Sequence, residues 1–152
     1  MVEAVKTFLL AMTPVGELRV ALPMGIIIYD LNWKLALLVS VLGNLVPVVF
    51  LLLFLGPIFK WLSNNFSIFN KFFNWLFERT RKKTGSKIEK YGNIALISFV
   101  AIPLPLTGAW TGAIAAFLFG IKFKKAFPLI ALGVLIAGII VLTLIQTGLW
   151  LI

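Results

Sequence analysis

The chain has 152 residues, of which 61% are hydrophobic and 12% charged, and its formal net charge is +9 at pH 7. Soluble domains average about 45–50% apolar and about 25% charged residues, and a fold this short leaves roughly a third of its surface in water. The composition therefore all but excludes a soluble enzyme, a disordered tail and a nucleic-acid module, and it predicts an integral membrane protein.

Cysteine and histidine are both absent. Their absence removes disulfides, Cys/His metal sites and every catalytic triad that uses imidazole, so we expect no cofactor, no metal and no enzymatic activity. In a membrane protein, positive charge is typical of cytoplasmic loops that meet anionic lipid headgroups. We therefore expect the lipid bilayer as a partner, not nucleic acid, and a multi-pass location in a prokaryotic cell membrane.

The first apolar stretch, Phe8 to Tyr29, is long enough to cross a bilayer, but it carries Glu17 and Arg19 near its middle. Proline removes a backbone donor and clashes with the preceding helical turn, so a Pro/Gly cluster predicts an interruption. The predicted breaks of this stretch are Pro14, Gly16 and Pro23.

The second stretch, Leu35 to Phe59, contains no charge and predicts a transmembrane helix. Asn44 lies inside it, and an amide at that depth must find a partner, so we expect Asn44 either to brace a break or to line a transport path. Residues 60–93 predict a linker: an amphipathic helix over Trp61 to Phe77 in the interface plane, then a basic turn against anionic headgroups at the cytoplasmic face.

The third stretch, Ile94 to Ile121, is uncharged and is interrupted by Pro103, Pro105 and Gly108. Two prolines and a glycine within six residues should end a helix, and freed backbone at membrane depth persists only inside protein or beside a wet cavity. A re-entrant hairpin here places eleven of the fourteen basic residues on the cytoplasmic side, as the positive-inside rule favours. The last stretch, Ala126 to Ile152, predicts a second transmembrane helix.

The two halves of the chain share one order of elements: a broken apolar segment and then a long helix. With the basic linker inside, residues 1–59 and residues 94–152 have opposite orientations within a single membrane domain. The predicted fold is an all-α integral membrane protein with an inverted repeat of two units, each a re-entrant hairpin followed by a transmembrane helix. Paired broken segments of this kind point to a transport site near the midplane.

Four segments resemble, in order, the Putative small multi-drug export protein family. They read PVGELRVALPMG (14–25), LGNLVP (42–47), IPLPLTGAWTG (102–112) and ALGVLIAG (131–138). That family is similar to the wider DedA/VTT superfamily of lipid scramblases and polyprenyl-phosphate translocases, which share two facing re-entrant hairpins. The resemblance implies this architecture and a function in transport.

Glu17 and Arg19 are the sharpest candidates for a substrate site, because an ionisable group at membrane depth costs about 2.5–3.5 kcal/mol on insertion scales. Arg19 would grip a phosphate or carboxylate through its planar fork, while Glu17 would exchange a proton or hold a cation. The alternative is an internal ion pair that fixes the tip of the hairpin. Residues two apart on one helix do not face each other, so we expect unwound backbone near Gly16.

In the second hairpin, Trp110 occupies the position equivalent to Arg19, and Thr107 is expected to cap the helix that follows. The N-terminus of that helix would attract an anion. Small residues then recur every four positions and predict a helix-packing face, which also allows contact with a second subunit and hence a homo-oligomer. They are Gly108, Gly112, Ala116 and Gly120.

Three functions stay open on these residues. The leading hypothesis is a transporter or lipid translocase for an amphiphilic, anionic substrate such as a polyprenyl phosphate or a phospholipid. The first alternative is a proton-coupled exporter of cationic small drugs with Glu17 as the binding charge, and the second is a non-transporting assembly or structural protein. The predicted transport site consists of Glu17, Arg19, Asn44, Thr107 and Trp110.

Overall fold

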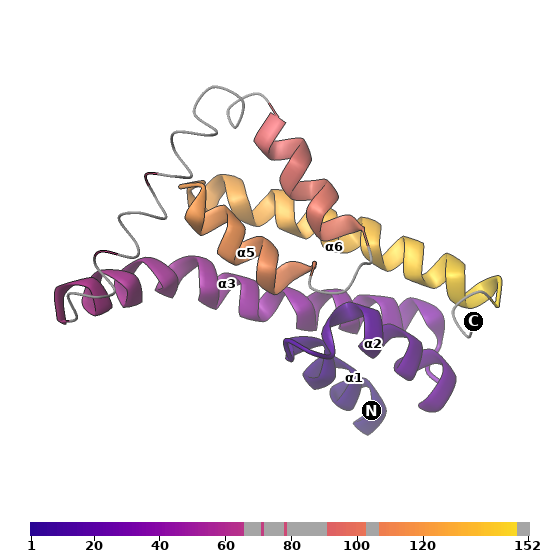
Figure 1. The fold of residues 1–152 in the computed structure, drawn as a ribbon. Coiled ribbons are helices and arrows are strands. Elements are labelled where there is room, and N and C mark those ends of the chain that lie inside the picture. Colours follow the sequence, from indigo (N-terminus) through magenta and orange to yellow (C-terminus); the bar gives the residue numbers. More distant parts are fainter. Residues whose placement is uncertain (66–70, 72–77, 79–90, 103–106, 149–152) are drawn as a thin grey trace.

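The computed structural model describes residues 1–65, 71, 78, 91–102 and 107–148 of the chain, and within them the secondary structure is helical, with no strand. Figure 1 shows two long helices, α3 and α6, with shorter helices packed on and between them. The predicted all-helical architecture is confirmed for this part of the chain.

The first apolar stretch folds as two short helices around a break. The helices are α1 (Val2–Met12), α2 (Glu17–Pro23) and its continuation η1 (Met24–Ile28). At the break, the Thr13 hydroxyl donates to the Leu10 carbonyl at 2.8 Å and accepts the Gly16 N–H at 2.9 Å. These bonds satisfy the backbone where the proline prevents a continuous helix, and residues 13–16 separate α1 from α2.

The break predicted at Pro23 is wrong. The chain stays helical through this buried proline and passes directly from α2 into the π-helical turn η1. In that wider turn the Tyr29 N–H donates to the carbonyl of Met24, five residues back. A π turn is rare and occurs mostly as a single turn within a helical segment, as it does here.

Two helices are long and apolar enough to cross a bilayer. They are α3 (Trp33–Asn65), over its part Trp33–Leu62, and α6 (Phe123–Gln146). At 1.5 Å per residue, these helices are about 50 Å and about 36 Å long, more than the roughly 30 Å of a hydrocarbon core. Helix α3 continues past the predicted end at Phe59, and most of the predicted amphipathic helix lies outside the described residues.

The third apolar stretch also folds as two short helices around a break, the helix Tyr91–Ala101 and α5 (Ala109–Leu118). Each is about 15 Å long, half of a hydrocarbon core, and they converge on the break in Figure 1. Gly108 precedes α5 in a conformation outside the helical region, so α5 begins after it. Pro103 and Pro105 lie outside the described residues.

The re-entrant course of both broken segments stays a prediction, and labelling of single cysteines tests it. Because a hairpin returns to the face from which it enters, thiols introduced by Lys71→Cys and Lys124→Cys should react from the same, cytoplasmic side. A thiol from Lys34→Cys, at the other end of α3, should react only from outside. Labelling of positions 71 and 124 from opposite faces would contradict the hairpin, and the cysteine-free parent is the control.

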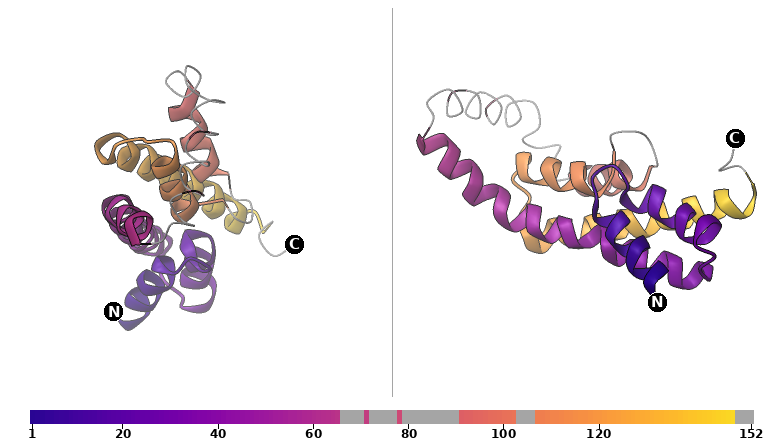
Figure 2. Two further views of the ribbon diagram at one scale, coloured as in Figure 1. Left: turned by 60° about the vertical axis from the view of Figure 1, so that its left-hand side comes forward. Right: turned by 90° about the horizontal axis from the view of Figure 1, so that it is seen from below.

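Helix α3 is the scaffold of the molecule. It packs against α1, α5 and α6, and α2 packs against both α3 and α6. Figure 2 shows α1 and α2 beside the first half of α3, with α5 further along it. The buried core joins α2, α3, α5, α6 and the helix Tyr91–Ala101. Its fully buried side chains include Leu18 and Leu22 of α2, Val48 of α3, Val100, and Ile130 and Val134 of α6.

The predicted small-residue face is used inside the chain. Gly112 and Ala116 are buried, and a Cβ at Gly112 would lie 2.5 Å from a methyl group of Val100 and 3.9 Å from Ile130. Gly112 therefore lets α5 approach its neighbouring helices closely. Gly120 does not belong to this face, because it follows α5 in an exposed turn with open space around it. Because this face packs within the chain, it gives no support to a homo-oligomer, which stays a prediction.

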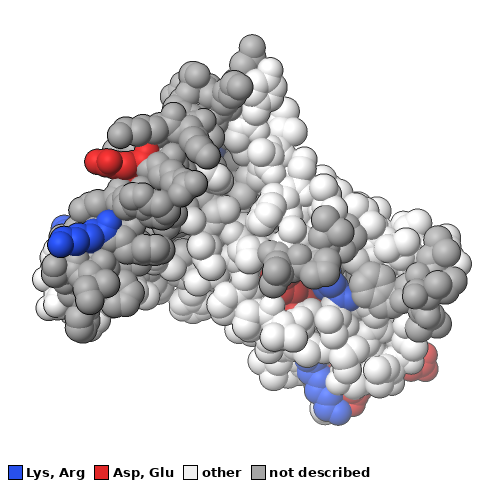
Figure 3. Space-filling model, viewed as in Figure 1, with Lys and Arg blue, Asp and Glu red and all other residues white. Residues whose placement is uncertain are grey.

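The described surface is mostly uncharged in the view of Figure 3, where charged atoms lie toward the periphery except for a small acidic and basic group near the middle. Many large apolar side chains of the long helices are exposed, including Phe50 and Phe54 of α3 and Leu135 and Ile139 of α6. Such a surface is costly in water and favourable in hydrocarbon.

Candidate functional site

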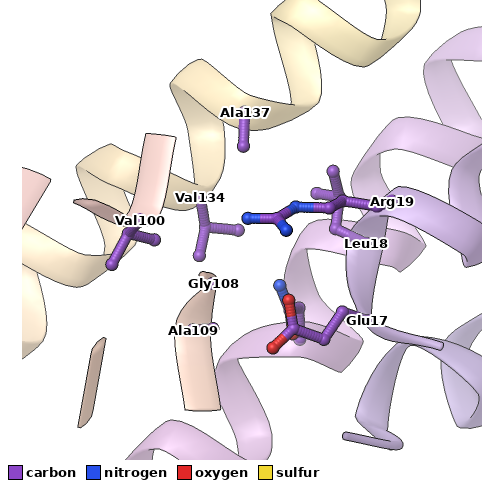
Figure 4. A pocket seen from close by; sticks show the side chains of 9 residues that line it. Glu17, Leu18, Arg19, Val100, Gly108, Ala109, Val134 and Ala137 are labelled. Atoms are coloured by element: carbon purple, nitrogen blue, oxygen red, sulfur yellow. The ribbon is translucent and has the colours of Figure 1, made fainter. Parts of the chain in front are cut away.

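The five residues predicted as a transport site lie around one small cavity or directly beside it. The cavity lies where the first break meets the second, and Figure 4 shows Glu17 and Arg19 reaching into it from α2 toward Gly108 and α6. Its volume is about 10 Å³, the room of a single water molecule. Its lining comes from five helices and consists of Glu17, Leu18, Arg19, Asn44, Val100, Gly108, Ala109, Val134 and Ala137.

Glu17 caps a helix that lies more than ninety residues further along the chain. Its side chain is buried, and one carboxylate oxygen accepts the backbone N–H of Trp110 at 3.4 Å. The backbone N–H of Ala109 also interacts with this carboxylate. These are the first amides of α5, which have no partner inside the helix. A carboxylate at a helix N-terminus also opposes the positive end of the helix dipole, so Glu17 replaces the cap that Gly108, without a side chain, cannot supply.

The backbone of Glu17 is strained to reach this position. Its φ angle is +41°, in the left-handed region that residues with a side chain rarely adopt. Such a conformation costs on the order of 1–3 kcal/mol and persists where the surrounding structure holds it. The strain starts α2 in the direction that sends the carboxylate to α5.

Gly108 is shaped to receive that carboxylate. Its φ of +143° and ψ of −165° lie in a region open almost only to glycine. A Cβ on this residue would overlap the carboxylate group of Glu17. Both the backbone conformation and the close approach therefore require glycine here.

Arg19 contacts the other side of the second break. Its guanidinium donates to the carbonyl of Ile102 at 3.1 Å and to the hydroxyl of Thr107 at 2.9 Å. The Thr107 hydroxyl in turn donates to the Ile102 carbonyl at 2.8 Å. The expectation that Thr107 caps α5 is therefore wrong, because its hydroxyl points back to the preceding helix and α5 has no side-chain cap of its own.

Together Glu17 and Arg19 form what we call the charge clamp. The negative group lies at the N-terminus of α5, and the positive group lies on the carbonyl just beyond the C-terminal end of the helix Tyr91–Ala101. Each charge thus opposes the helix-dipole end that it complements. The clamp joins the two breaks and satisfies backbone groups that proline and glycine leave free.

Asn44 lines the cavity from the middle of α3. It is 3% exposed, and its Oδ1 is buried without a hydrogen-bond partner among the described residues. A buried acceptor without a partner costs on the order of 1–3 kcal/mol, so its presence beside a charged pair requires an explanation.

Trp110 connects the cavity to a larger groove. Its backbone N–H binds Glu17, while its side chain lines an apolar groove of about 440 Å³ between α3, α5 and the end of α1. The indole N–H of Trp110 is buried and has no partner. The other residues that line the groove are Met12, Pro47, Phe50, Leu51, Phe54, Leu55 and Ile58.

Sequence reasoning missed this groove and the carbonyl of Ile102. The groove residues of α3 recur at positions 47, 50, 51, 54, 55 and 58, which is one face of a helix. The spacing was visible, but α3 is apolar around its whole circumference, so no polar face marks where the groove lies.

Two of the three comparisons with known proteins give no match: neither the curated proteins nor the solved structures contain a similar chain. The third comparison, with protein families, gives one. Residues 17–140 match the family described as "Putative small multi-drug export protein". The match begins at Glu17 and includes α2, α3, α5 and most of α6, so it covers the charge clamp, Asn44 and the residues that line the groove except Met12.

Proposed function

The chain belongs to the Putative small multi-drug export protein family, and from this premise we propose that it exports lipophilic organic cations through the groove beside the charge clamp. The family name describes a transporter and not a class of enzyme. With the apolar helices α3 and α6, it supports a membrane protein that moves small molecules.

The groove is the observation that carries the proposal. Drug-sized ligands bind in clefts of about 300–1,000 Å³ with mostly apolar and aromatic walls, and the groove meets both requirements. Phe50, Phe54 and Trp110 offer ring faces, and ring faces attract desolvated organic cations. The backbone N–H of Trp110 binds Glu17, so the groove lies one residue away from a buried negative charge, although Glu17 itself does not line it.

The geometry gives less support to an anionic substrate in the small cavity. The N-terminus of α5 already holds the Glu17 carboxylate, and Arg19 already donates to Ile102 and Thr107. The cavity holds one water and has no room for a phosphate. An anionic headgroup would therefore have to displace groups of the chain itself.

One observation favours an anionic amphiphile as a second candidate. The indole N–H of Trp110, a residue that lines the apolar groove, is a buried donor without a partner among the described residues, and a rotation of the side chain would offer it to an oxygen of a polyprenyl phosphate or phospholipid whose chain occupies the groove. The two candidates differ in which part of Trp110 they need: a cation uses the ring face, and an anion uses the N–H.

Substitutions at Trp110 separate the candidates in proteoliposomes. For a cation such as ethidium, we expect Trp110→Phe to keep most of the flux and Trp110→Leu to lose about 3–30-fold, the equivalent of about 0.5–2 kcal/mol of cation–π attraction. Both variants keep the backbone N–H that Glu17 accepts. Phe123→Leu, which removes an aromatic ring of α6 outside the groove, is the matched control and should change little.

The second candidate predicts the opposite pattern. If the anionic candidate is right, flux of a polyprenyl phosphate should fall equally in Trp110→Phe and Trp110→Leu, and the parent protein should show no ethidium flux. These results would replace the proposed cationic substrate with an anionic one. Loss of neither activity in Trp110→Leu would remove the groove from the transport path.

A further inference from the structure

The apolar groove beside Trp110 opens sideways onto an uncovered surface of α3. Phe50, Phe54 and Ile58 line it, and their exposed fractions are 58%, 50% and 50%. Leu53 lies on α3 outside the lining and is also 50% exposed, so the groove continues into bare apolar surface. Because the apolar surface of a membrane-spanning helix meets hydrocarbon, the groove opens to lipid and not to water.

The groove is about as long as one leaflet is deep. Along α3 it runs from Pro47 to Ile58, which is about 16 Å at 1.5 Å per residue, or half of a hydrocarbon core of roughly 30 Å. Lys60 and Trp61 follow directly, and side chains of these types favour the membrane interface. One end of the groove therefore lies close to the lipid headgroups beside Lys60, and the other end lies near the middle of the bilayer.

Helix α5 forms the second wall of the groove. Figure 1 shows α5 beside α3, from the middle of α3 toward its C-terminal end, and the two helices pack against each other. Trp110, in the first turn of α5, lines the inner end of the groove. Phe117, near the last turn, has its ring centroid 4.7 Å from that of Phe59, just beyond the outer end. The two helices thus enclose an elongated space that suits a long, narrow apolar group.

The lining decides which occupant gains from the groove. Its described residues are uncharged, and lipid chains are as apolar as these side chains, so no hydrophobic driving force favours another apolar molecule over lipid. An empty groove would leave its walls without contact atoms, so lipid fills it. Phe50 and Phe54 offer what a lipid chain cannot use. Their rings stack with centroids 6.1 Å apart, and ring faces attract a desolvated cation.

We propose that one acyl chain of a phospholipid, from the leaflet beside Lys60, occupies the groove of the resting protein, and that an export substrate enters sideways from this leaflet by displacing the chain. The substrate class is then a cation that already resides in the bilayer and spreads its charge over an aromatic body. The route of substrate entry rests on the proposed export function, whereas the lipid site itself does not.

Fluorescence quenching in nanodiscs tests the lipid site without any substrate. The emission of the parent minus that of Trp110→Phe isolates Trp110 from the other four tryptophans. Phosphatidylcholine with a nitroxide on its acyl chain should quench this emission, and more strongly with the nitroxide near the end of the chain than near the headgroup. Iodide in the water should not quench it. Stronger quenching by iodide than by the labelled lipid would overturn the opening to the bilayer.

Larger side chains in the groove separate a chain inside it from the lipid around the protein. Leu51→Phe and Leu55→Phe each add volume to the lining, so most of the quenching by chain-labelled lipid should be lost. Leu53→Phe is the matched control, because it makes the same change on the exposed surface of α3 outside the groove and should quench like the parent. Quenching that persists in both groove variants would overturn the lipid site.

Two ions of one shape test the displacement. Tetraphenylphosphonium should relieve the lipid quenching of Trp110, and tetraphenylborate should need about 3–30-fold more, at equal concentrations in the bilayer, because ring faces do not attract an anion. Equal displacement by both ions would overturn the substrate class.

Flux in proteoliposomes separates the lipid site from export. Tetraphenylphosphonium flux should fall in Leu55→Phe and persist in Leu53→Phe. Lipid quenching without flux of any cation in the parent would confirm the lipid site and refute the proposed export function. Flux that stays unchanged in Leu55→Phe would refute entry through the groove.

Discussion

Replacement of Gly108 by alanine is expected to lower the free energy of unfolding by about 2–5 kcal/mol, through backbone strain and overpacking together. The φ of +143° is open almost only to glycine, and the new Cβ would overlap the Glu17 carboxylate. The Glu17 side chain must then leave the N-terminus of α5, which loses its cap. Thermal unfolding in detergent measures the effect.

Gly120 supplies the matched control for this substitution. Its φ of +68° is also unfavourable for alanine, but open space surrounds it, so Gly120→Ala should cost only about 1–2 kcal/mol. The double variant Glu17→Ala/Gly108→Ala should lose less unfolding free energy than the two single variants lose together, because without the Glu17 carboxylate the new Cβ has nothing to overlap. Equal stability of Gly108→Ala and Gly120→Ala would contradict the close contact.

Exchange of the two charges of the clamp should fail to restore stability. Glu17→Ala should cost about 1–3 kcal/mol, because it leaves the first amides of α5 without a cap. Arg19→Ala should cost less, because the Ile102 carbonyl is at an exposed position and still accepts the Thr107 hydroxyl. The double variant Glu17→Arg/Arg19→Glu would restore a simple ion pair. In the clamp it places a positive group at the N-terminus of α5 and a negative group against the Ile102 carbonyl, so it should be less stable than either single alanine variant.

Thermal unfolding of the three variants decides between a clamp and an ion pair. If the exchanged variant recovers parental stability, Glu17 and Arg19 stabilise the protein as an ion pair, and their positions at the helix ends contribute nothing. Glu17→Gln is the control for shape, since its amide oxygen still accepts the Trp110 N–H, and its loss of stability should be smaller than that of Glu17→Ala.

The breaks and the long helices were predictable because local chemistry decides them. Proline and glycine at 14–16 and at 108 end helices whatever surrounds them, and uncharged runs of more than twenty residues predict α3 and α6. Pro23 shows the limit of this reasoning. A single proline can also lie inside a helix, as Pro23 does in α2 and Pro128 does in α6, and tertiary packing determines which of the two results follows.

The partners of the charged residues were not predictable because they lie far away in the sequence. Glu17 and Arg19 stood out from the sequence alone, but nothing local indicates that their partners are helix ends 83 to 93 residues away. Thr107 was predicted to cap α5 from its position, whereas Arg19 competes for its hydroxyl. The substrate roles of these residues stay predictions.

The long reach of the charge clamp has a consequence for biogenesis. Glu17 and Arg19 are synthesised and enter the membrane well before residues 102–110 exist, so the N-terminal half must pass through a stage with two ionisable side chains and no final partners. Until the second half arrives, water or the insertion machinery must solvate these charges. Arrival of the second break then buries Glu17 and gives both charges their final hydrogen-bond partners, which makes docking of the two halves, and not the insertion of either alone, the event that completes the fold.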